Sequence, residues 1–131
     1  MTRPTEEPVI RIATTPMDAN VYGGVFGGWL LSIMDAGAGL IAARFTKGQT
    51  ATVAVDGISL ESPVKVGDEV SVYGKVERIG RTSFTVPVES WKRDRHEEES
   101  SLVGRALFTF VALDAGGKPR RIDENPKEQA A

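Results

Sequence analysis

The longest apolar stretch of the chain, residues 25–43, predicts a helix over 27–43. The stretch combines Trp, Leu, Ile, Met and several alanines without a proline, which is typical of a helix of this length. On a helical wheel one side carries the larger apolar residues and is expected to pack on a sheet: Phe26, Trp29, Leu30, Ile33, Leu40 and Ile41. The opposite side is mostly small, so another segment or a ligand can approach the backbone there: Gly28, Leu31, Ser32, Asp35, Ala38, Gly39 and Ala42.

Four segments after this helix have the pattern of β-strands. Apolar and polar residues alternate in the first three, and the fourth is apolar at both parities, which indicates a central strand covered on both faces. The segments are 49–62, 69–77, 81–92 and 102–113, and residues 9–13 can add an early strand. One long helix followed by strands with tight turns predicts an α+β fold, in which a five- to six-stranded antiparallel sheet wraps around a long central helix.

Three local features of these strands lead to specific expectations. The apolar positions change parity at Asp56-Gly57, which predicts a bulge. In 69–77 the valines share one face, so Ser71 and Tyr73 are expected on a wet face. Pro87 has no N–H to donate, so it is expected where no ladder bond is needed, at a sheet edge or at a bulge.

Composition and charge narrow the class of protein. With 131 residues, 40% hydrophobic and 26% charged, the chain is expected to form one domain over 1–131, with an ordered core of about 8–122 and unstructured ends, 1–7 and from about 114 onward. A net charge of -2 argues against a nucleic-acid partner. The absence of cysteine and a polar start without a signal sequence favour the cytoplasm. Asp35 and four glycines interrupt the apolar stretch, so we expect no membrane segment.

Asp35 is the first candidate for chemistry. A carboxylate in so apolar a helix is expensive to bury unless it is paired, hydrogen-bonded or functional. The alternative is a buried structural aspartate, satisfied by a neighbouring backbone amide or by Arg44. Its position on the side with small residues favours a function.

The glycine-rich segment 18–28 is the second candidate, because its last amides become the unpaired donors of a helix N-terminus and can hold an oxyanion. The alternative is an ordinary flexible loop, in which Asn20 is a loop cap. The only histidine, His96, is surrounded by charged residues and is expected in a solvated hairpin loop. No histidine is then left for a Ser-His-Asp triad or a histidine-based dehydratase, and no metal site is expected.

Together, DANVYGGVFGGWLLSIMDAGAG, TVAVDGISLESPVKVGD, IGRTSFTV and ALFTFVALDAGGKPR resemble the YciA-type acyl-CoA thioesterases of the hotdog superfamily. The resemblance covers nearly all of residues 14–122. It implies a hotdog fold, a homodimer with a continuous sheet, often assembled into a trimer of dimers, and active sites at the dimer interface. It also implies hydrolysis of acyl-CoA to free fatty acid and CoA, with no cofactor beyond the CoA of substrate and product.

The resemblance also implies roles for individual residues. Asn20 of one chain acts with Asp35 of its partner, and the amides of Gly27 and Gly28 stabilise the oxyanion. Asp35 either activates water as a general base or attacks the thioester directly, and both routes stay open. Contacts to CoA are expected from Thr52 and Val53 along the pantetheine, Arg81, Thr82 and Ser83 along the nucleotide, and Lys118, Arg120 and Arg121 at the phosphates.

Two other functions remain as hypotheses. The first is a non-catalytic hotdog module that binds acyl-CoA without turning it over. The second, a hydratase or dehydratase acting on enoyl thioesters, is disfavoured because its usual histidine has no counterpart here.

Overall fold

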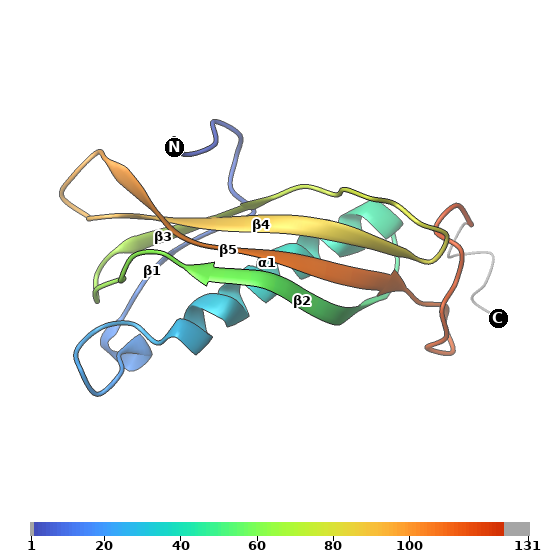
Figure 1. Ribbon diagram of the computed structural model, residues 1–131, viewed down its shortest axis with the longest axis horizontal. Helices are drawn as coiled ribbons and strands as arrows, with labels where there is room; N and C mark the ends of the chain where they lie inside the picture. The colour runs from blue at the N-terminus through green and yellow to red at the C-terminus, as the bar shows by residue number, and fades with distance from the viewer. Residues whose placement is uncertain (1, 125–131) are drawn as a thin grey trace.

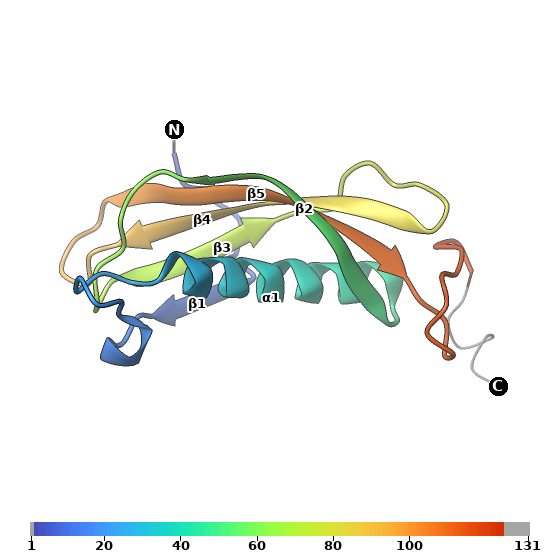
Figure 2. The same ribbon diagram turned by 60° about the horizontal axis from the view of Figure 1, so that its bottom comes forward.

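A computed structural model describes residues 2–124, in which a single long helix lies against one face of a five-stranded antiparallel sheet (Figures 1 and 2). The helix is α1 (Gly27–Thr46), and a short 3-10 helix, η1 (Pro16–Asp18), precedes it. The strands are β1 (Ile10–Ala13), β2 (Thr50–Leu60), β3 (Glu69–Gly74), β4 (Ser83–Arg93) and β5 (Ser100–Ala112). Their order is β1-β3-β4-β5-β2, so β2 is an edge strand. The α+β fold and the hotdog arrangement are confirmed, with five strands.

Helix α1 packs on the sheet through a stripe of residues spaced four apart. The buried members of this stripe are Leu30, Met34, Ala38 and Ala42. They meet the inward side chains of the central strands, among them Val72, Phe84, Val86, Phe108 and Phe110. Trp29, Ile33 and Ile41 are partly buried and flank the stripe.

The predicted core side of the helix is therefore partly wrong. Phe26 and Leu40 are 50% and 55% exposed, while two residues assigned to the opposite side, Ala38 and Ala42, are fully buried. The reason is the close approach of the sheet: a Cβ on Gly37 would lie 2.9 Å from the Val72 side chain. The sheet contacts the helix where side chains are small, and the large ones are displaced to its flanks.

Two of the local strand predictions are confirmed. The pairing of β2 with β5 shifts between Asp56 and Ser59, so the predicted bulge is present. Pro87 lies one residue beyond the last pair of β4 with β3, Gly74–Val88, so the proline stands where β3 has ended.

The predicted wet face of β3 is wrong, because Ser71 and Tyr73 are only 2% and 5% exposed. Arg11 of β1 reaches over this face, and its Nε and Nη2 donate to the two hydroxyl oxygens at 2.9 and 3.4 Å. Arg11 also lies 3.4 Å from the Glu69 carboxylate. A charged side chain from the neighbouring strand thus covers a face that the alternation assigned to solvent.

Residues 114–124, which follow β5, form a turn and a hydrogen-bonded segment, so the expectation of an unstructured tail from about 114 is wrong for these residues. The Asp114 carboxylate accepts from the amides of Gly116 and Lys118, both at 2.9 Å, and closes a turn. Arg120 follows at 3% exposure, and its Nη2 donates to the Thr46 carbonyl at 2.8 Å. The tail is held because Arg120 satisfies a carbonyl that the end of α1 leaves unpaired. No helix within residues 2–124 is long and apolar enough to cross a membrane.

Candidate active site

Asp35 lies on the side of α1 that faces the edge strand β2. Its side chain is exposed, and Thr52 Oγ1 donates to its Oδ1 at 2.9 Å. Within residues 2–124 no hydrogen bond reaches the second carboxylate oxygen, and no ion pair joins Asp35 to Arg44. The alternative of a buried structural aspartate is therefore wrong: the carboxylate has one oxygen held and the other open.

The loop that leads into α1 is organised by Asn20. The Asn20 side-chain oxygen accepts from the amides of Tyr22 and Gly24 at 2.8 and 3.1 Å, and the Asn20 N–H donates to the Gly24 carbonyl at 2.6 Å. Gly23, at φ +89°, makes the turn that an ordinary residue rarely adopts. Because the side-chain oxygen is occupied, the Nδ2 group is the part of Asn20 left to donate to a ligand, and it has no acceptor in the described part of the chain.

The N-terminus of α1 offers free backbone donors. Phe26 is the N-cap without a side-chain cap, and the first amide bonded inside the helix is that of Leu30, to the Phe26 carbonyl. Across residues 2–124 the amides of Gly27 and Gly28 have no acceptor. A Cβ on Gly28 would meet nothing within 4 Å, so a ligand can reach the backbone there. Such an open helix start stabilises negative charge.

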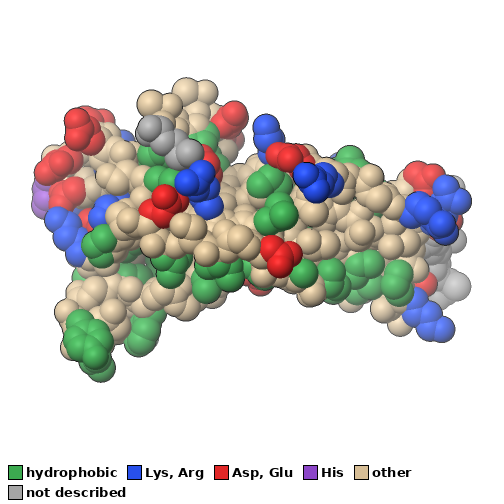
Figure 3. All heavy atoms as spheres, in the orientation of Figure 1, with side chains coloured by type: hydrophobic (Ala, Val, Ile, Leu, Met, Phe, Trp, Pro, Cys, Tyr) green, Lys and Arg blue, Asp and Glu red, His purple; other side chains and the backbone are tan. Residues whose placement is uncertain are grey.

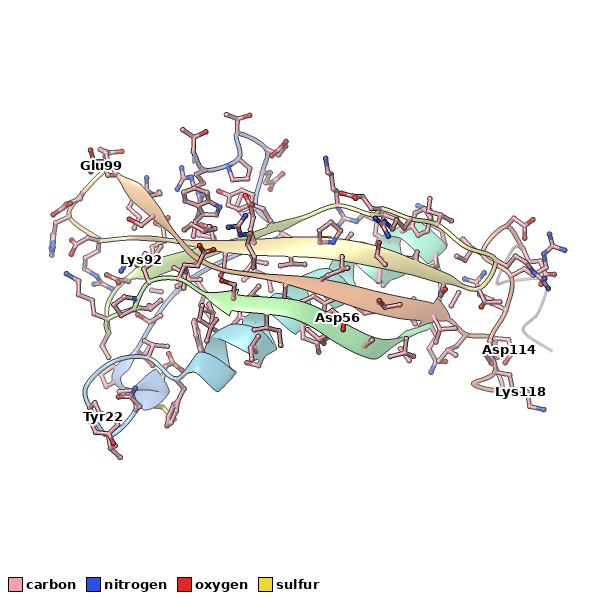
Figure 4. All side chains as sticks on the ribbon, viewed as in Figure 1. Tyr22, Asp56, Lys92, Glu99, Asp114 and Lys118 are labelled. Carbon is pink, nitrogen blue, oxygen red and sulfur yellow. The ribbon has the colours of Figure 1, made fainter. Side chains whose placement is uncertain are left out.

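One chain does not bring these two parts together. Asp35 follows Gly27 by eight residues on the same helix, which is about 12 Å along its axis at the usual rise per residue. Asn20 lies beyond Gly27, in the protruding loop whose tip carries Tyr22 (Figure 4). The carboxylate and the amide donors of a single chain are therefore too far apart to act on one carbonyl group.

The surface beside Asp35 is unusually apolar for an exposed one. Four side chains of β2 are between 37% and 58% exposed: Val53, Val55, Ile58 and Leu60. Hydrophobic side chains gather along this edge of the molecule, over β2 and α1 (Figure 3). Within the described residues β2 pairs on one side only, with β5. An open strand edge lined with apolar side chains is a surface suited to pairing with another chain.

Most of the expected CoA-binding residues lie at one end of the sheet. Thr52 and Ser83 pair with consecutive residues of β5, Phe110 and Val111, so they stand two strands apart, about 10 Å at the usual strand spacing. Val53 lies next to Thr52 at a register shift and is 58% exposed. The chain around Arg81 and Thr82 accepts backbone bonds from Ile122 and Ala112. Lys118 lies at the same end, in the turn after β5 (Figure 4).

Arg120 does not join that group. Its guanidinium is buried and donates to four backbone carbonyls, those of Thr46, Leu113, Arg121 and Glu124, at 2.8 to 3.2 Å. These bonds use four of the five N–H donors of a side chain that is only 3% exposed. We correct the expected phosphate contact accordingly: Arg120 anchors the C-terminal segment to the end of α1.

His96 lies in the exposed hairpin between β4 and β5, as expected. Its side chain is 84% exposed and its Nδ1 is 3.6 Å from Asp94. The hydrogen bond between Lys65 and Asp94, at 2.7 Å, is the largest cause that lowers the pKa of Asp94 and raises that of Lys65; the His96 backbone amide lowers the pKa of Asp94 further, and the charge of Asp94 raises that of Lys65 further. Residues 2–124 contain no cluster of acidic, histidine or cysteine side chains able to hold a metal ion.

Two features of the site had no clear signal in the sequence. One is the bond from Thr52 to Asp35, since Thr52 was expected only along the pantetheine path. The other is a pair of buried polar residues beneath the glycine-rich loop, Thr14 and Asp68, each 2% exposed. A tight turn between the strands 49–62 and 69–77 was expected, but nothing in the sequence showed which loop that turn supports.

The chain is similar to several known sequences over most of its length. A sequence model of the thioesterase superfamily matches residues 22–99. An uncharacterized acyl-CoA thioester hydrolase of Zymomonas mobilis is 44% identical over 119 residues, which cover 91% of this chain and 80% of the relative. The acyl-CoA thioester hydrolase YciA of Escherichia coli is 37% identical over 122 residues, covering 91% of this chain and 92% of the relative.

The solved structures that resemble this chain are also thioesterases or acyl-CoA hydrolases. The hexameric thioesterase of Yersinia pestis has a TM-score of 0.86 at 37% identity, covering 94% of this chain and 100% of that chain. A hexameric hotdog fold thioesterase of Campylobacter jejuni has a TM-score of 0.86 at 34% identity, covering 96% and 97%. The acyl-CoA hydrolase of Staphylococcus aureus, solved with butyryl coenzyme A, has a TM-score of 0.80 at 29% identity, covering 86% and 68%. It was also solved as alanine mutants of one asparagine and one aspartate, 15 residues apart.

The family model matches more than half of the chain, and the identity of the two relatives extends over 91% of it, so the likeness does not depend on one motif. The structural likeness covers the helix, the sheet and the loop before the helix together. The chain belongs to the thioesterase superfamily, has the hotdog fold, and has the YciA-type acyl-CoA thioester hydrolases as its relatives.

Proposed function

We propose that this protein hydrolyses acyl-CoA to a free fatty acid and CoA, in active sites formed between two copies of the chain. The observation that carries the proposal is the open Asp35 carboxylate beside the unpaired edge of β2, about 12 Å along the helix from the free amides of its own Gly27. All the groups that a thioesterase needs are present, but one chain keeps them apart.

An antiparallel pairing of two β2 edges would join these groups. Leu60, near the end of β2, approaches Gly27: a Cβ on that glycine would lie 3.2 Å from its Cδ1. Thr52, near the start of β2, holds Asp35. Antiparallel strands place the end of one opposite the start of the other. The helix start of one chain would then face the carboxylate of its partner, and the two-fold axis would create two such sites.

The staphylococcal hydrolase supports the choice of Asn20 and Asp35. The asparagine and the aspartate changed to alanine in that enzyme are 15 residues apart. Asn20 and Asp35 have the same separation, and both flank the start of the long helix. The pair is thus the counterpart, by residue type and spacing, of two positions that were singled out in a related acyl-CoA hydrolase.

The chemistry follows from which atoms are free. Thr52 holds one oxygen of Asp35, so the other can take a proton from water or attack the thioester carbon, and the two routes remain alternatives. The Gly27 amide, with that of Gly28, would stabilise the oxyanion that develops on the carbonyl. Asn20 would add its Nδ2 as a donor, because its oxygen is used within the loop. The reaction needs water and acyl-CoA only.

The CoA moiety would lie along the end of the sheet that carries Thr52, Val53 and the 81–83 segment. Thr82 and Ser83 can donate to phosphate oxygens, and the side chains of Arg81 and Lys118 have no ion-pair partner among residues 2–124. Exposed cations without a partner suit a phosphorylated ligand of an acidic protein. Arg120 takes no part.

Assembly beyond the dimer belongs to the same proposal. Both the Yersinia and the Campylobacter thioesterases are hexamers. We expect a trimer of dimers, in which the paired β2 edges form the contact within each dimer. The cytoplasm, expected from the composition, is the proposed compartment, and no nucleic-acid or membrane partner is proposed.

The direct test is release of free thiol from a series of acyl-CoAs, from acetyl-CoA to palmitoyl-CoA, followed with a thiol-reactive dye. We expect turnover, with a maximum at one range of chain lengths. The rival hypothesis is a binding module. Calorimetry that shows tight binding of acyl-CoA, with no thiol released over hours, would establish the module and refute the enzyme.

Thr52→Val tests whether Thr52 orients Asp35 or contacts CoA. Valine keeps the shape but removes the donor to the carboxylate, so we expect kcat to fall about tenfold or more, the effect of losing a hydrogen bond to a charged group, with little change in KM. Thr52→Ser, which keeps the hydroxyl, is the matched control and should stay near the parental kcat. A raised KM with unchanged kcat would instead assign Thr52 to CoA binding alone.

A further inference from the structure

Thr14 and Asp68 form a buried polar junction beneath the glycine-rich loop. Thr14 ends the segment after β1, and its hydroxyl lies 3.1 Å from the carbonyls of Lys65 and Asp68 while it accepts the Gly67 amide at 2.9 Å. The Asp68 carboxylate accepts the Lys65 amide at 3.0 Å. Both side chains are 2% exposed. Together they hold the turn 64–68 in one conformation.

The turn 64–68 contacts the glycine-rich loop through backbone hydrogen bonds. The Val64 carbonyl accepts the Val25 amide at 2.9 Å, and Gly24 forms a bridge with Lys65. A Cβ on Gly24 would lie 3.6 Å from the Val64 carbonyl oxygen, so the two backbones are in contact. A displacement of Val64 is therefore passed directly to the residues between Asn20 and the start of α1.

The loop is held at its base, where Val25 packs against the core, and not at its tip. Its tip is bare, since Val21 and Tyr22 are 89% and 92% exposed. The bonds made by Asn20 are internal to the loop and do not fix its position relative to the body of the protein. Besides the Val64 contact, the Phe26 amide donates to the Asp18 carbonyl at 3.1 Å. Asp18 ends η1, which begins two residues after Thr14, so a short stretch of chain links this second anchor to the same junction.

We infer that Thr14 and Asp68 are positioning residues for hydrolysis: they set the location of the Asn20 side chain and the Gly27 amide by fixing the turn 64–68. The inference rests on the proposed function and extends it to residues that touch no substrate. A geometric error of about 1 Å at a reacting group lowers a rate by up to about 10²-fold. In the proposed dimer the loop amides must be placed to within about 1 Å relative to Asp35 of the partner chain.

Exposed contacts hold the same turn from the other side, and they provide a control. Lys65 pairs with Asp94 at 2.7 Å, and Arg95 Nε donates to the Gly67 carbonyl at 3.0 Å. The Lys65 side chain is 68% exposed. Exposed ion pairs contribute little to structure, so Lys65→Met should leave kcat within about twofold of the parent.

The test compares two pairs of variants in the full-length protein, assayed with the acyl-CoA that the parent hydrolyses fastest. Thr14→Val removes the hydroxyl, whereas Thr14→Ser keeps it. Asp68→Ala removes the acceptor for the Lys65 amide, whereas Asp68→Asn keeps an oxygen there. We expect kcat to fall about tenfold to 10²-fold for Thr14→Val and Asp68→Ala, with KM changed less than kcat, and near-parental kcat for Thr14→Ser and Asp68→Asn.

A double-mutant cycle separates positioning from general loss of stability. Asn20→Asp keeps the oxygen that organises the loop but removes the Nδ2 donor. If Thr14 acts by placing that donor, Thr14→Val should lower kcat much less in the Asn20→Asp background than in the parent. Circular dichroism and thermal unfolding, with assays well below the melting temperature, confirm that each variant is folded. If Thr14→Val does not fold, Thr14→Ala assayed at lower temperature takes its place.

The outcomes are distinct for the two proposals. Equal kcat for Thr14→Val, Asp68→Ala and the parent would overturn the inference while Asn20 and Asp35 variants still lose activity. Full additivity of Thr14→Val with Asn20→Asp would also overturn it and leave a purely structural junction. No hydrolysis by the parent itself would refute the proposed function instead.

Discussion

Replacing Asp35 with asparagine is expected to lower kcat for acyl-CoA hydrolysis by about 10²-fold to 10⁴-fold, the usual loss for a catalytic acid or base. Asparagine can neither take a proton from water nor attack the thioester. It does keep an oxygen for the Thr52 hydroxyl, which donates at 2.9 Å to Asp35. The measurement is thiol release under saturating acyl-CoA, with the parent and Asp35→Asn at equal concentration.

The exposure of Asp35 makes this result easy to interpret. The side chain is not part of the core, so Asp35→Asn should change the free energy of unfolding by less than about 1 kcal/mol. Glu99, an exposed carboxylate in the hairpin between β4 and β5, provides the control: Glu99→Gln should retain the parental kcat. Parental activity of Asp35→Asn would exclude both the general-base and the nucleophilic route, and with them the proposed site.

Mixing two inactive variants should restore activity if each site draws on two chains. Asn20→Asp alone is expected to cost about 10²-fold in kcat, the effect of removing one oxyanion donor. In a mixed dimer of Asn20→Asp with Asp35→Asn, one site combines both changes and the other combines neither. Random pairing of equal amounts then yields roughly a quarter of the parental activity, because half of the dimers are mixed and each holds one intact site.

The mixed dimers can be prepared by co-expression with two different affinity tags and isolated by two successive purifications. Asn20→Asp and Asp35→Asn carried by the same chain, paired with a parental chain, serve as the matched control, since each shared site then carries one of the two changes and no site is intact. If both residues acted within one chain, the mixed dimer of single variants would stay inactive, whereas the matched control would keep half of the parental activity.

Several elements of the molecule are determined by local sequence. The helix begins at Gly27, as the glycine-rich run before the apolar stretch predicted, and it continues to Thr46, three residues past the predicted end. Each predicted strand is present, within a few residues of its expected limits. The bulge near Gly57 follows from the change in parity of the apolar residues. These features depend on periodicity and turn residues that lie next to one another along the chain.

The site was only partly predictable, because some of its groups meet residues that lie far away in the sequence. Asn20 and Asp35 were identified through the resemblance of whole segments, and the oxyanion donors through the glycine-rich start of the helix. Arg120 was expected to contact the CoA phosphates from the C-terminal segment. In the fold it lies against the end of α1, where the Thr46 carbonyl needs a donor. Proximity between residues 74 positions apart is not a property of either local sequence.

The sequence by itself thus determined where the helix and strands form, which residue types are available for thioester chemistry, and the family to which the chain belongs. The tertiary structure decided which face of α1 is buried, since the sheet approaches at Gly37 and the small residues rather than at the largest ones. It also decided that Thr52 holds Asp35, that Thr14 and Asp68 support the glycine-rich loop, and that one chain separates its carboxylate from its amide donors. The physical reason is that local patterns report the free energy of each segment alone, whereas burial and hydrogen-bond partners depend on which distant segments meet.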